Sequence, residues 1–496
     1  MHVSYKWLAA TVLILGGAMS FLDQTIVNIA IPRLQQTFGA DIHSIQWVVT
    51  AYLLAQGALT ATTPYLSQRL GSKRAYLISL VAFTLGSALC GFAWNLPMLI
   101  LFRVLQGLGG AILFPLTLAF FFTIFPPAER GTAMAVMGLP SLVVPALGPV
   151  VGGYLITVAS WRVIFFINVP IGIVAILLGM LVLRETRTAG AVRFDLPGFL
   201  TSAYGLAAVL YAFSQASTNG WESPSILALL SSGGLALVAF VAIELVTVHR
   251  GGRPLLDLRL FANRTFSAGN GALAVIAASL FSILFLLPLY LQTLRGLSAL
   301  QASFILLPQA LATILSTLLG GRLVDRLGDA RPVMIPGLVL LAVGTWLLTR
   351  ITLLTPYWQF DLILVVIGLA FGMILQPLTV ATMAPIRDAE SVANGSTLIT
   401  VVRAVAGSLG LAVLATLVQT QTQENIRQLE AHMLHPVTSQ LQQQAFLLAM
   451  QDVFFLTALL TILALIITAL LQKKQSPFYG SKPASTSYAE KEASTD

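Results

Sequence analysis

Two ionisable side chains of opposite charge interrupt long apolar runs of the sequence, and they are the residues best suited to carry chemistry. Asp23 lies in the run 19–32, where Gln24 and Asn28 add polar groups, and Arg103 lies in a separate apolar run. An ionised Asp near the centre of a membrane helix costs about 2.5–3.5 kcal/mol by insertion scales, so such a charge usually has a function. We interpret Asp23 as a residue that binds and releases a proton.

The depths of Asp23 and Arg103 allow the two side chains to meet. Counted from the expected outer ends of their helices, Asp23 lies about 12 Å deep and Arg103 about 9 Å deep. A carboxylate that is shielded from water but close to a guanidinium can exchange a proton for another cation. The alternative is a buried ion pair that only locks two helices together.

The composition requires that membrane helices position these residues. Of 496 residues, 57% are hydrophobic and 9% are charged, with a mean hydropathy of +0.87, which is typical of a polytopic membrane protein. The net charge of +8 then reflects positive loops on one side of a membrane rather than nucleic-acid binding. Cys90 is the single cysteine and no phosphate-binding GxxxxGK[ST] motif occurs, so we expect no metal, no cofactor, no catalytic residues and no ATPase activity.

Apolar runs long enough to cross about 30 Å predict fourteen membrane helices. They are expected near 7–31, 45–67, 75–93, 97–122, 131–156, 162–183, 197–216, 225–248, 266–291, 301–320, 332–352, 359–383, 396–420 and 451–472. With the N-terminus inside, the inner segments carry twenty Lys and Arg and the outer segments five. This asymmetry predicts a multi-pass protein of the plasma membrane, that is, a bacterial inner or cytoplasmic membrane, with both termini cytoplasmic.

An internal repeat divides the chain into two halves. Residues 64–74 match residues 321–331 at a constant offset, sharing Leu, Arg, Leu, Gly and Arg, and a second echo relates 114–117 to 376–379. Repeated six-helix halves are typical of transporters that rock about a central site. We expect an N-terminal half (1–183), two extra helices with linkers (184–265), a C-terminal half (266–472) and a disordered cytoplasmic tail (473–496), the extra helices being structural.

Four motifs together resemble those of a known family. They are residues 22–32 around Asp23, residues 103–107 beginning at Arg103, the pair Gly148-Pro149 with Gly152-Gly153, and residues 161–172. This set is similar to the motifs of the fourteen-helix drug:proton antiporters of the major facilitator superfamily, the EmrB/QacA type. The resemblance implies an all-α fold of two six-helix repeats plus two extra central helices.

The resemblance also implies roles for individual residues. Asp23 would be the carboxylate that binds protons and substrate cations, Arg103 its partner, and Gly148, Pro149, Gly152 and Gly153 the antiporter motif. Gln24, Asn28, Gln106 and Gln376 would line the cavity. Residues of the two repeated loops would act as cytoplasmic gates: Arg69, Gly71, Arg74, Gly321, Asp325, Arg326 and Gly328. The first loop departs from the family pattern, since Pro64 and Gln68 replace its usual Gly and Asp, so the latch there is in doubt.

The expected function is proton-driven export of lipophilic neutral or monocationic compounds, since one deep carboxylate would leave a dication unpaired. Its partners would be small lipophilic substrates, protons, the lipid bilayer and, if the host has an outer membrane, a periplasmic adaptor. A dedicated exporter of one metabolite, lipid or antibiotic, or a non-transporting membrane sensor, remains open, whereas an enzyme is not expected.

Three further features carry weaker expectations. Glu244, four residues from a helix end, is expected to snorkel to the membrane interface. Arg403 could line a cavity of the second half or face interfacial water. The loop 421–450 is expected to be a helical hairpin broken at Pro436, as solvated helix extensions rather than a docking surface.

Overall fold

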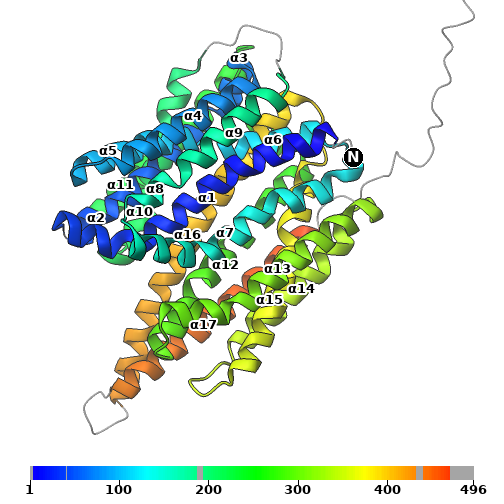
Figure 1. The fold of residues 1–496 in the computed structure, drawn as a ribbon. Coiled ribbons are helices and arrows are strands. Elements are labelled where there is room, and N and C mark those ends of the chain that lie inside the picture. The colour runs from blue at the N-terminus through cyan, green and yellow to red at the C-terminus, as the bar shows by residue number, and fades with distance from the viewer. Residues whose placement is uncertain (1–3, 41, 187–193, 432–438, 470–496) are drawn as a thin grey trace, which may run out of the picture.

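A computed structural model describes residues 4–40, 42–186, 194–431 and 439–469, and it contains only helices in these ranges (Figure 1). The first half of the chain forms α1 (Tyr5–Phe38), α2 (Ile42–Thr60), α3 (Thr63–Leu70), α4 (Ser72–Gly91), α5 (Leu96–Gly110), α6 (Leu113–Ile124), α7 (Arg130–Val158), α8 (Val163–Phe166) and α9 (Asn168–Val182). A hairpin of α10 (Leu196–Asn219) and α11 (Pro224–His249) follows. The remainder forms α12 (Arg264–Leu289), α13 (Ala299–Leu327), α14 (Arg331–Leu348), α15 (Tyr357–Met383), α16 (Ala389–Ala431) and α17 (Ser439–Ala469).

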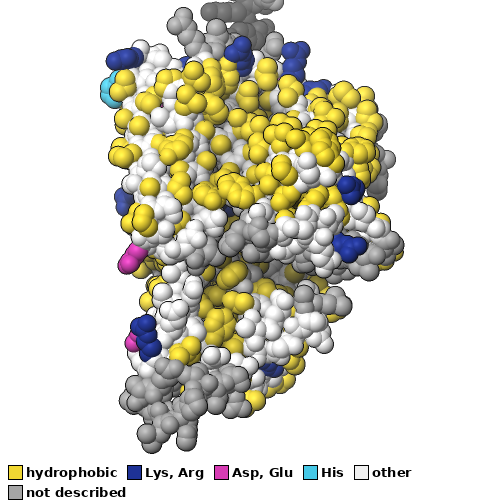
Figure 2. Space-filling model, turned by 90° about the vertical axis from the view of Figure 1, so that its left-hand side faces the viewer, with side chains coloured by type: hydrophobic (Ala, Val, Ile, Leu, Met, Phe, Trp, Pro, Cys, Tyr) yellow, Lys and Arg dark blue, Asp and Glu magenta, His cyan; other side chains and the backbone are white. Residues whose placement is uncertain are grey.

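Twelve helical spans of the described residues are long and apolar enough to cross a membrane. The expected spans 45–67 and 131–156 coincide with α2–α3 and α7, which are not among those twelve. The count of fourteen therefore stays a prediction. Figure 2 shows one face of the molecule, on which hydrophobic side chains spread widely and Lys and Arg lie mainly towards the rim, as a lipid-facing surface requires.

The helices pack in two groups, seen in Figure 1 as the blue-to-teal helices α1–α9 and the green-to-red helices α12–α17. Within the first group α1 packs on α7 and α9, and α5 packs on α2 and α4; within the second, α15 packs on α13 and α14, and α12 packs on α16 and α17. The groups meet where α7 lies against α13 and α6 against α16. The exact domain limits expected from the sequence remain a prediction.

Three expected helices are interrupted: 162–183 divides into α8 and α9, and a proline explains each of the other two breaks. Expected helix 97–122 divides into α5 and α6, because Pro115 has no N–H for the carbonyl of Ala111. The hydroxyl of Thr60 lies 3.3 Å from that carbonyl, in a longer contact than its 2.7 Å hydrogen bond to the carbonyl of Gln56. Expected helix 45–67 divides in the same way before Pro64, where the carbonyl of Thr60 accepts from the Thr63 hydroxyl over 2.7 Å.

Other helix ends also differ from expectation. The sequence placed the end of the first helix at Pro32, but α1 continues through it to Phe38 and stops at Gly39, whose φ of 60° is left-handed. Membrane helices tolerate an internal proline when neighbouring groups satisfy the freed backbone. In the loop 421–450, α16 extends to Ala431 and α17 starts at Ser439, whereas Pro436 and the tail 473–496 lie outside the described residues.

The α10–α11 hairpin is not a detached addition, because α10 packs on both α2 and α16. Trp47 of α2 stacks on Tyr211 of α10, with ring centroids 5.3 Å apart. Trp221, just after α10, donates from Nε1 to the Thr416 hydroxyl of α16 over 2.7 Å. The hairpin therefore bridges the two groups of helices.

The expectation for Glu244 is wrong. The residue is 1% exposed, and its carboxylate points into the protein to accept a hydrogen bond from the backbone of Leu255. A snorkelling side chain would reach water at the membrane surface instead. The connection after α11 folds back over the end of the helix and covers the carboxylate.

Candidate functional site

Asp23 lies near the middle of α1 with its carboxylate enclosed by protein, and the residue is 1% exposed. Arg103 of α5 donates from Nη1 to Oδ2 over 2.5 Å. Gln106, one turn further along α5, donates from Nε2 to Oδ1 over 2.9 Å. The structure thus brings together the two charges that the sequence placed at similar depth, and both carboxylate oxygens have donors, as a buried charge requires.

Arg103 is held from several directions. Its Nε donates to the carbonyl of Val48 on α2 over 2.9 Å, and its Nη1 also donates to Gln106 Oε1 over 2.8 Å. The guanidinium lies over the ring of Tyr52, 4.2 Å from the centroid. Arg103 and Gln106 share one face of α5 because residues three apart are neighbours on a helix. The pair therefore joins α1, α2 and α5.

Two residues of this site were not assigned from the sequence. Asn168 begins α9 and points Nδ2 at Asp23 Oδ1, 3.5 Å away, and at the Ser87 hydroxyl, 3.2 Å away. Its own Oδ1 is buried and has no hydrogen-bond partner among the described residues. The hydroxyl of Tyr52 lies 3.1 Å from that of Ser20. Asn168 was within a recognised motif, but nothing in the sequence placed α9 against Asp23.

The other expected cavity residues are distributed differently. Gln24 lies half-buried beside Tyr52. Gln376 is buried, and its amide fills the space over Gly138 of α7. Gly152 is buried in α7. Four expected residues remain: Asn28, Gly148, Pro149 and Gly153. The structure describes their helical backbone but not the surroundings of their side chains.

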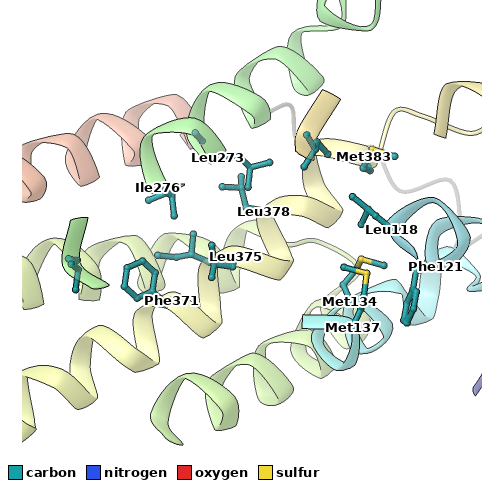
Figure 3. Close-up of a cluster of buried hydrophobic side chains, with 14 of the residues drawn as sticks. Leu118, Phe121, Met134, Met137, Leu273, Ile276, Phe371, Leu375, Leu378 and Met383 are labelled. Carbon is teal, nitrogen blue, oxygen red and sulfur yellow. The ribbon is translucent and has the colours of Figure 1, made fainter. Parts of the chain in front are cut away.

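Apolar side chains also join the two groups of helices. Leu118 and Phe121 of α6 and Met134 and Met137 of α7 belong to the same buried cluster as side chains of α12 and α15. Figure 3 shows the two sets facing each other, with Leu118 directed towards Leu378 and Met383 of α15. Water is therefore excluded at this level of the interface.

A carboxylate latch joins the groups where α7 begins and α13 ends. Asp325 accepts hydrogen bonds from the backbone N–H groups of Gly131 and Thr132, each over 2.7 Å. These are free N–H groups of the first turn of α7, where the helix dipole favours an anion. Beside the latch a side chain on Gly321 would start 2.5 Å from the carbonyl oxygen of Gly131, so only glycine allows this approach.

The first repeated loop makes no such contact between the groups. Arg69 donates to the hydroxyl of Tyr65, within α3. Arg74 lies 3.8 Å from Glu185, whose carboxylate also accepts from the backbone at Lys73 and Arg74. The space over Gly71 is filled by Glu185, and the φ of 89° at Gly71 is left-handed.

In the second loop Gly328 caps α13 with a left-handed φ of 66°, while Arg326 is exposed. Only the second copy has the carboxylate, Asp325, that joins the groups. Among the described residues, only the second repeated loop therefore forms a latch between the two groups. The first loop, where the sequence put the latch in doubt, does not form one.

Arg403 faces the other group of helices rather than interfacial water. Its guanidinium lies 5.9 Å from the ring centroid of Phe114 on α6, and Phe114 in turn packs edge-on against Phe21 of α1. In the described part of the chain no carboxylate lies within ion-pair distance of Arg403. Within the described ranges, Arg403 is therefore a cation without a counter-ion between the two groups.

Long apolar helices, two packed groups and a polar cluster buried between helices define a multi-pass helical membrane protein. Residues 13–411 match the Major Facilitator Superfamily. The chain is 36% identical over 424 residues to a multidrug resistance protein B homolog of Mycobacterium tuberculosis, covering 83% of this chain and 76% of the relative. It is 34% identical over 416 residues to the puromycin resistance protein pur8 of Streptomyces alboniger, covering 83% and 81%.

The fold agrees with solved structures as well. The proton:xylose symporter XylE superposes with a TM-score of 0.63 at 16% identity, covering 95% of this chain and 96% of XylE. The chain belongs to the Major Facilitator Superfamily. It is accordingly a transporter rather than an enzyme, and it acts on small substrates in a membrane.

Proposed function

We propose that the protein is a proton-coupled multidrug exporter of the fourteen-helix drug:proton antiporter type, which moves lipophilic neutral or monocationic compounds. The observation that carries the proposal is the enclosed Asp23–Arg103 pair, a carboxylate shielded from water that joins α1 to α5. The names of relatives that confer multidrug or puromycin resistance support drug efflux as the task.

The geometry suggests how a proton would drive movement. With Asp23 ionised, its carboxylate holds α1 to α5 through Arg103 and Gln106. A proton on Asp23 would remove the charge that attracts the guanidinium, and the pair would then separate, because an unpaired buried charge is costly. Proton binding is thereby linked to a rearrangement of α1 against α5, with the antiporter motif (Gly148, Pro149, Gly152 and Gly153) as the pliable neighbour in α7.

Alternating access would complete the cycle. In the described conformation the Asp325 latch closes the end where α7 begins. Opening of that end would admit substrate, and closing it again would release substrate on the other side as Asp23 takes up a proton. One pH unit supplies about 1.4 kcal/mol, and one charge crossing 100 mV adds about 2.3 kcal/mol, so no cofactor is required beyond the proton gradient.

The same proposal includes the membrane in which the protein lies and its orientation there. The distribution of Lys and Arg favours a bacterial cytoplasmic (inner) membrane with both termini cytoplasmic, and a periplasmic adaptor would be needed only if the host has an outer membrane. A dedicated exporter of one endogenous compound is the second candidate, since the same ion pair would serve it equally well.

Flux in liposomes tests the proposal. Purified wild type, Asp23→Asn and Asp452→Asn are compared, the last because Asp452 is an exposed carboxylate on α17. A pH gradient should drive a fluorescent lipophilic monocation in wild type and Asp452→Asn but not in Asp23→Asn. Equal movement in all three proteins would remove Asp23 from coupling, and flux of a single screened compound would favour the dedicated exporter.

A further inference from the structure

The end of the α10–α11 hairpin contains two carboxyl groups that both approach Gly198, those of the half-buried Asp195 and the buried Glu244. Asp195 caps the start of α10, with Oδ1 accepting from the Gly198 N–H over 2.9 Å. Glu244, near the end of α11, is 1% exposed, and its Oε2 accepts from the Leu255 N–H over 2.9 Å. Each carboxyl thus uses one oxygen for a backbone contact.

The second oxygen of each carboxyl is buried and has no hydrogen-bond partner among the described residues: Asp195 Oδ2 and Glu244 Oε1. Both lie over Gly198. A β-carbon placed on that glycine would be 2.6 Å from Asp195 Oδ2 and 2.9 Å from Glu244 Oε1. The two unpartnered oxygens therefore both border the space next to Gly198, which a larger residue would fill.

No positive charge in the described ranges compensates this pair. Asp195 and Glu244 form no ion pair there, and Asp195 of α10 and Asp257 of the following segment each add a negative charge near Glu244. Asp257 is itself paired with Arg259, over 2.8 Å. Two ionised carboxylates in one buried space would repel strongly, whereas a single proton between them supplies the missing donor.

We propose that Glu244 and Asp195 form a proton-binding site in which one proton on Glu244 Oε1 is donated to Asp195 Oδ2. Loss of that proton to water leaves two facing carboxylates and opens the contact. The site is separate from Asp23 and does not depend on the proposed transport function.

The position of this site links its protonation to the attachment of the α10–α11 hairpin. Glu244 also holds Leu255, and two residues later the Asp257 N–H donates to Asn394 Oδ1 of α16 over 3.0 Å. The segment between these contacts is buried through Leu255 and Leu256. The protonated pair therefore fastens the hairpin to the connection that leads into the second group of helices, and deprotonation should loosen that connection.

Infrared spectroscopy of the purified full-length protein tests the protonation directly. At neutral pH the C=O stretch of a protonated carboxyl should be present in wild type and lost in Glu244→Gln. Glu222→Gln alters an exposed carboxylate in the turn between α10 and α11 and should leave the band unchanged. In Asp195→Asn the same band should titrate at lower pH than in wild type, because a neighbouring negative charge has been removed.

Hydrogen exchange tests the consequence and separates it from a merely structural contact. Glu244→Gln keeps an N–H donor towards Asp195 but cannot lose it, so it mimics the protonated pair. Protection of the Leu255 amide in wild type, taken relative to Glu244→Gln at the same pH, should fall as pH rises. An infrared band that survives Glu244→Gln, or protection that stays equal in both proteins at every pH, would overturn the proposal. If Glu244→Gln does not fold, the Asp195→Asn titration decides alone, and an unshifted band contradicts a shared proton.

Discussion

Gln106 donates to the oxygen of Asp23 that Arg103 leaves free, over 2.9 Å, and it accepts from Arg103 with its own carbonyl oxygen, over 2.8 Å. The amide therefore closes a ring of three buried side chains rather than lining an open cavity. A charge pair of this kind is fully satisfied only while all three members are present.

The first prediction concerns the stability of the pair. Asp23→Leu leaves the Arg103 guanidinium buried without a counter-ion and should destabilise the protein by about 3–5 kcal/mol, whereas Asp23→Leu combined with Arg103→Leu should recover most of that loss. Denaturant unfolding in detergent measures both. If the two substitutions were additive, the side chains would not be energetically coupled.

The second prediction concerns the amide. Gln106→Leu removes one donor from Asp23 and one acceptor from Arg103 at nearly constant size, and it should cost about 1–3 kcal/mol, because it leaves buried polar atoms unsatisfied. Gln106→Glu should cost more, since it places a second carboxylate beside Asp23. A Gln106→Leu protein as stable as wild type would mean that the ring is not closed in the membrane.

The third prediction concerns the latch. Asp325→Asn removes the charge that binds the first turn of α7, so the end of the bundle at Gly131 should open more often. Spin labels at the exposed positions 128 and 322, in a Cys90→Ser background, should report a larger share of long distances. Asp329→Asn is the control, because among the described residues Asp329 accepts only from the nearby backbone of Arg331. Identical distance distributions in the two variants would show that the latch does not hold the conformation.

The fourth prediction concerns selectivity. Arg403 presents a positive charge beside Phe114 without a described counter-ion, and it should therefore disfavour cationic substrates. Arg403→Gln should raise the transport of a monocation relative to a neutral compound of similar size, while the exposed Arg350→Gln should not. Competition between the two compounds in liposomes measures the ratio, and an unchanged ratio would place Arg403 outside the substrate path.

The sequence predicted the class of fold well, because membrane helices are recognised from apolar length alone. It also predicted the Asp23–Arg103 contact, since depth in a membrane can be counted along a helix. It could not place Asn168 or Tyr52 at the same site, because rotation and neighbours of a helix depend on packing that hydropathy does not encode. The breaks at Pro64 and Pro115 depend on how the freed carbonyls are satisfied, by the nearby Thr63 hydroxyl in the first case and by contact with Thr60 of another helix in the second.

Glu244 illustrates the same limit. Its position near the end of the helix was predicted correctly, but the chain after α11 returns to cover it, and no periodicity within the helix indicates that return. The two-sided packing of α10 on α2 and α16 was missed for a similar reason, since it depends on contacts between distant segments.

Proton release on substrate binding is the most direct test of the role of Asp23. Wild-type protein is first brought to an acid pH at which Asp23 carries a proton and its pair with Arg103 is open. In weakly buffered detergent solution it should then release protons when it binds a lipophilic monocation, because the cation takes the place of the proton on Asp23. Asp23→Asn should bind the compound without releasing protons. Release of the same number of protons by both proteins would contradict the account and place the coupling group elsewhere in the chain.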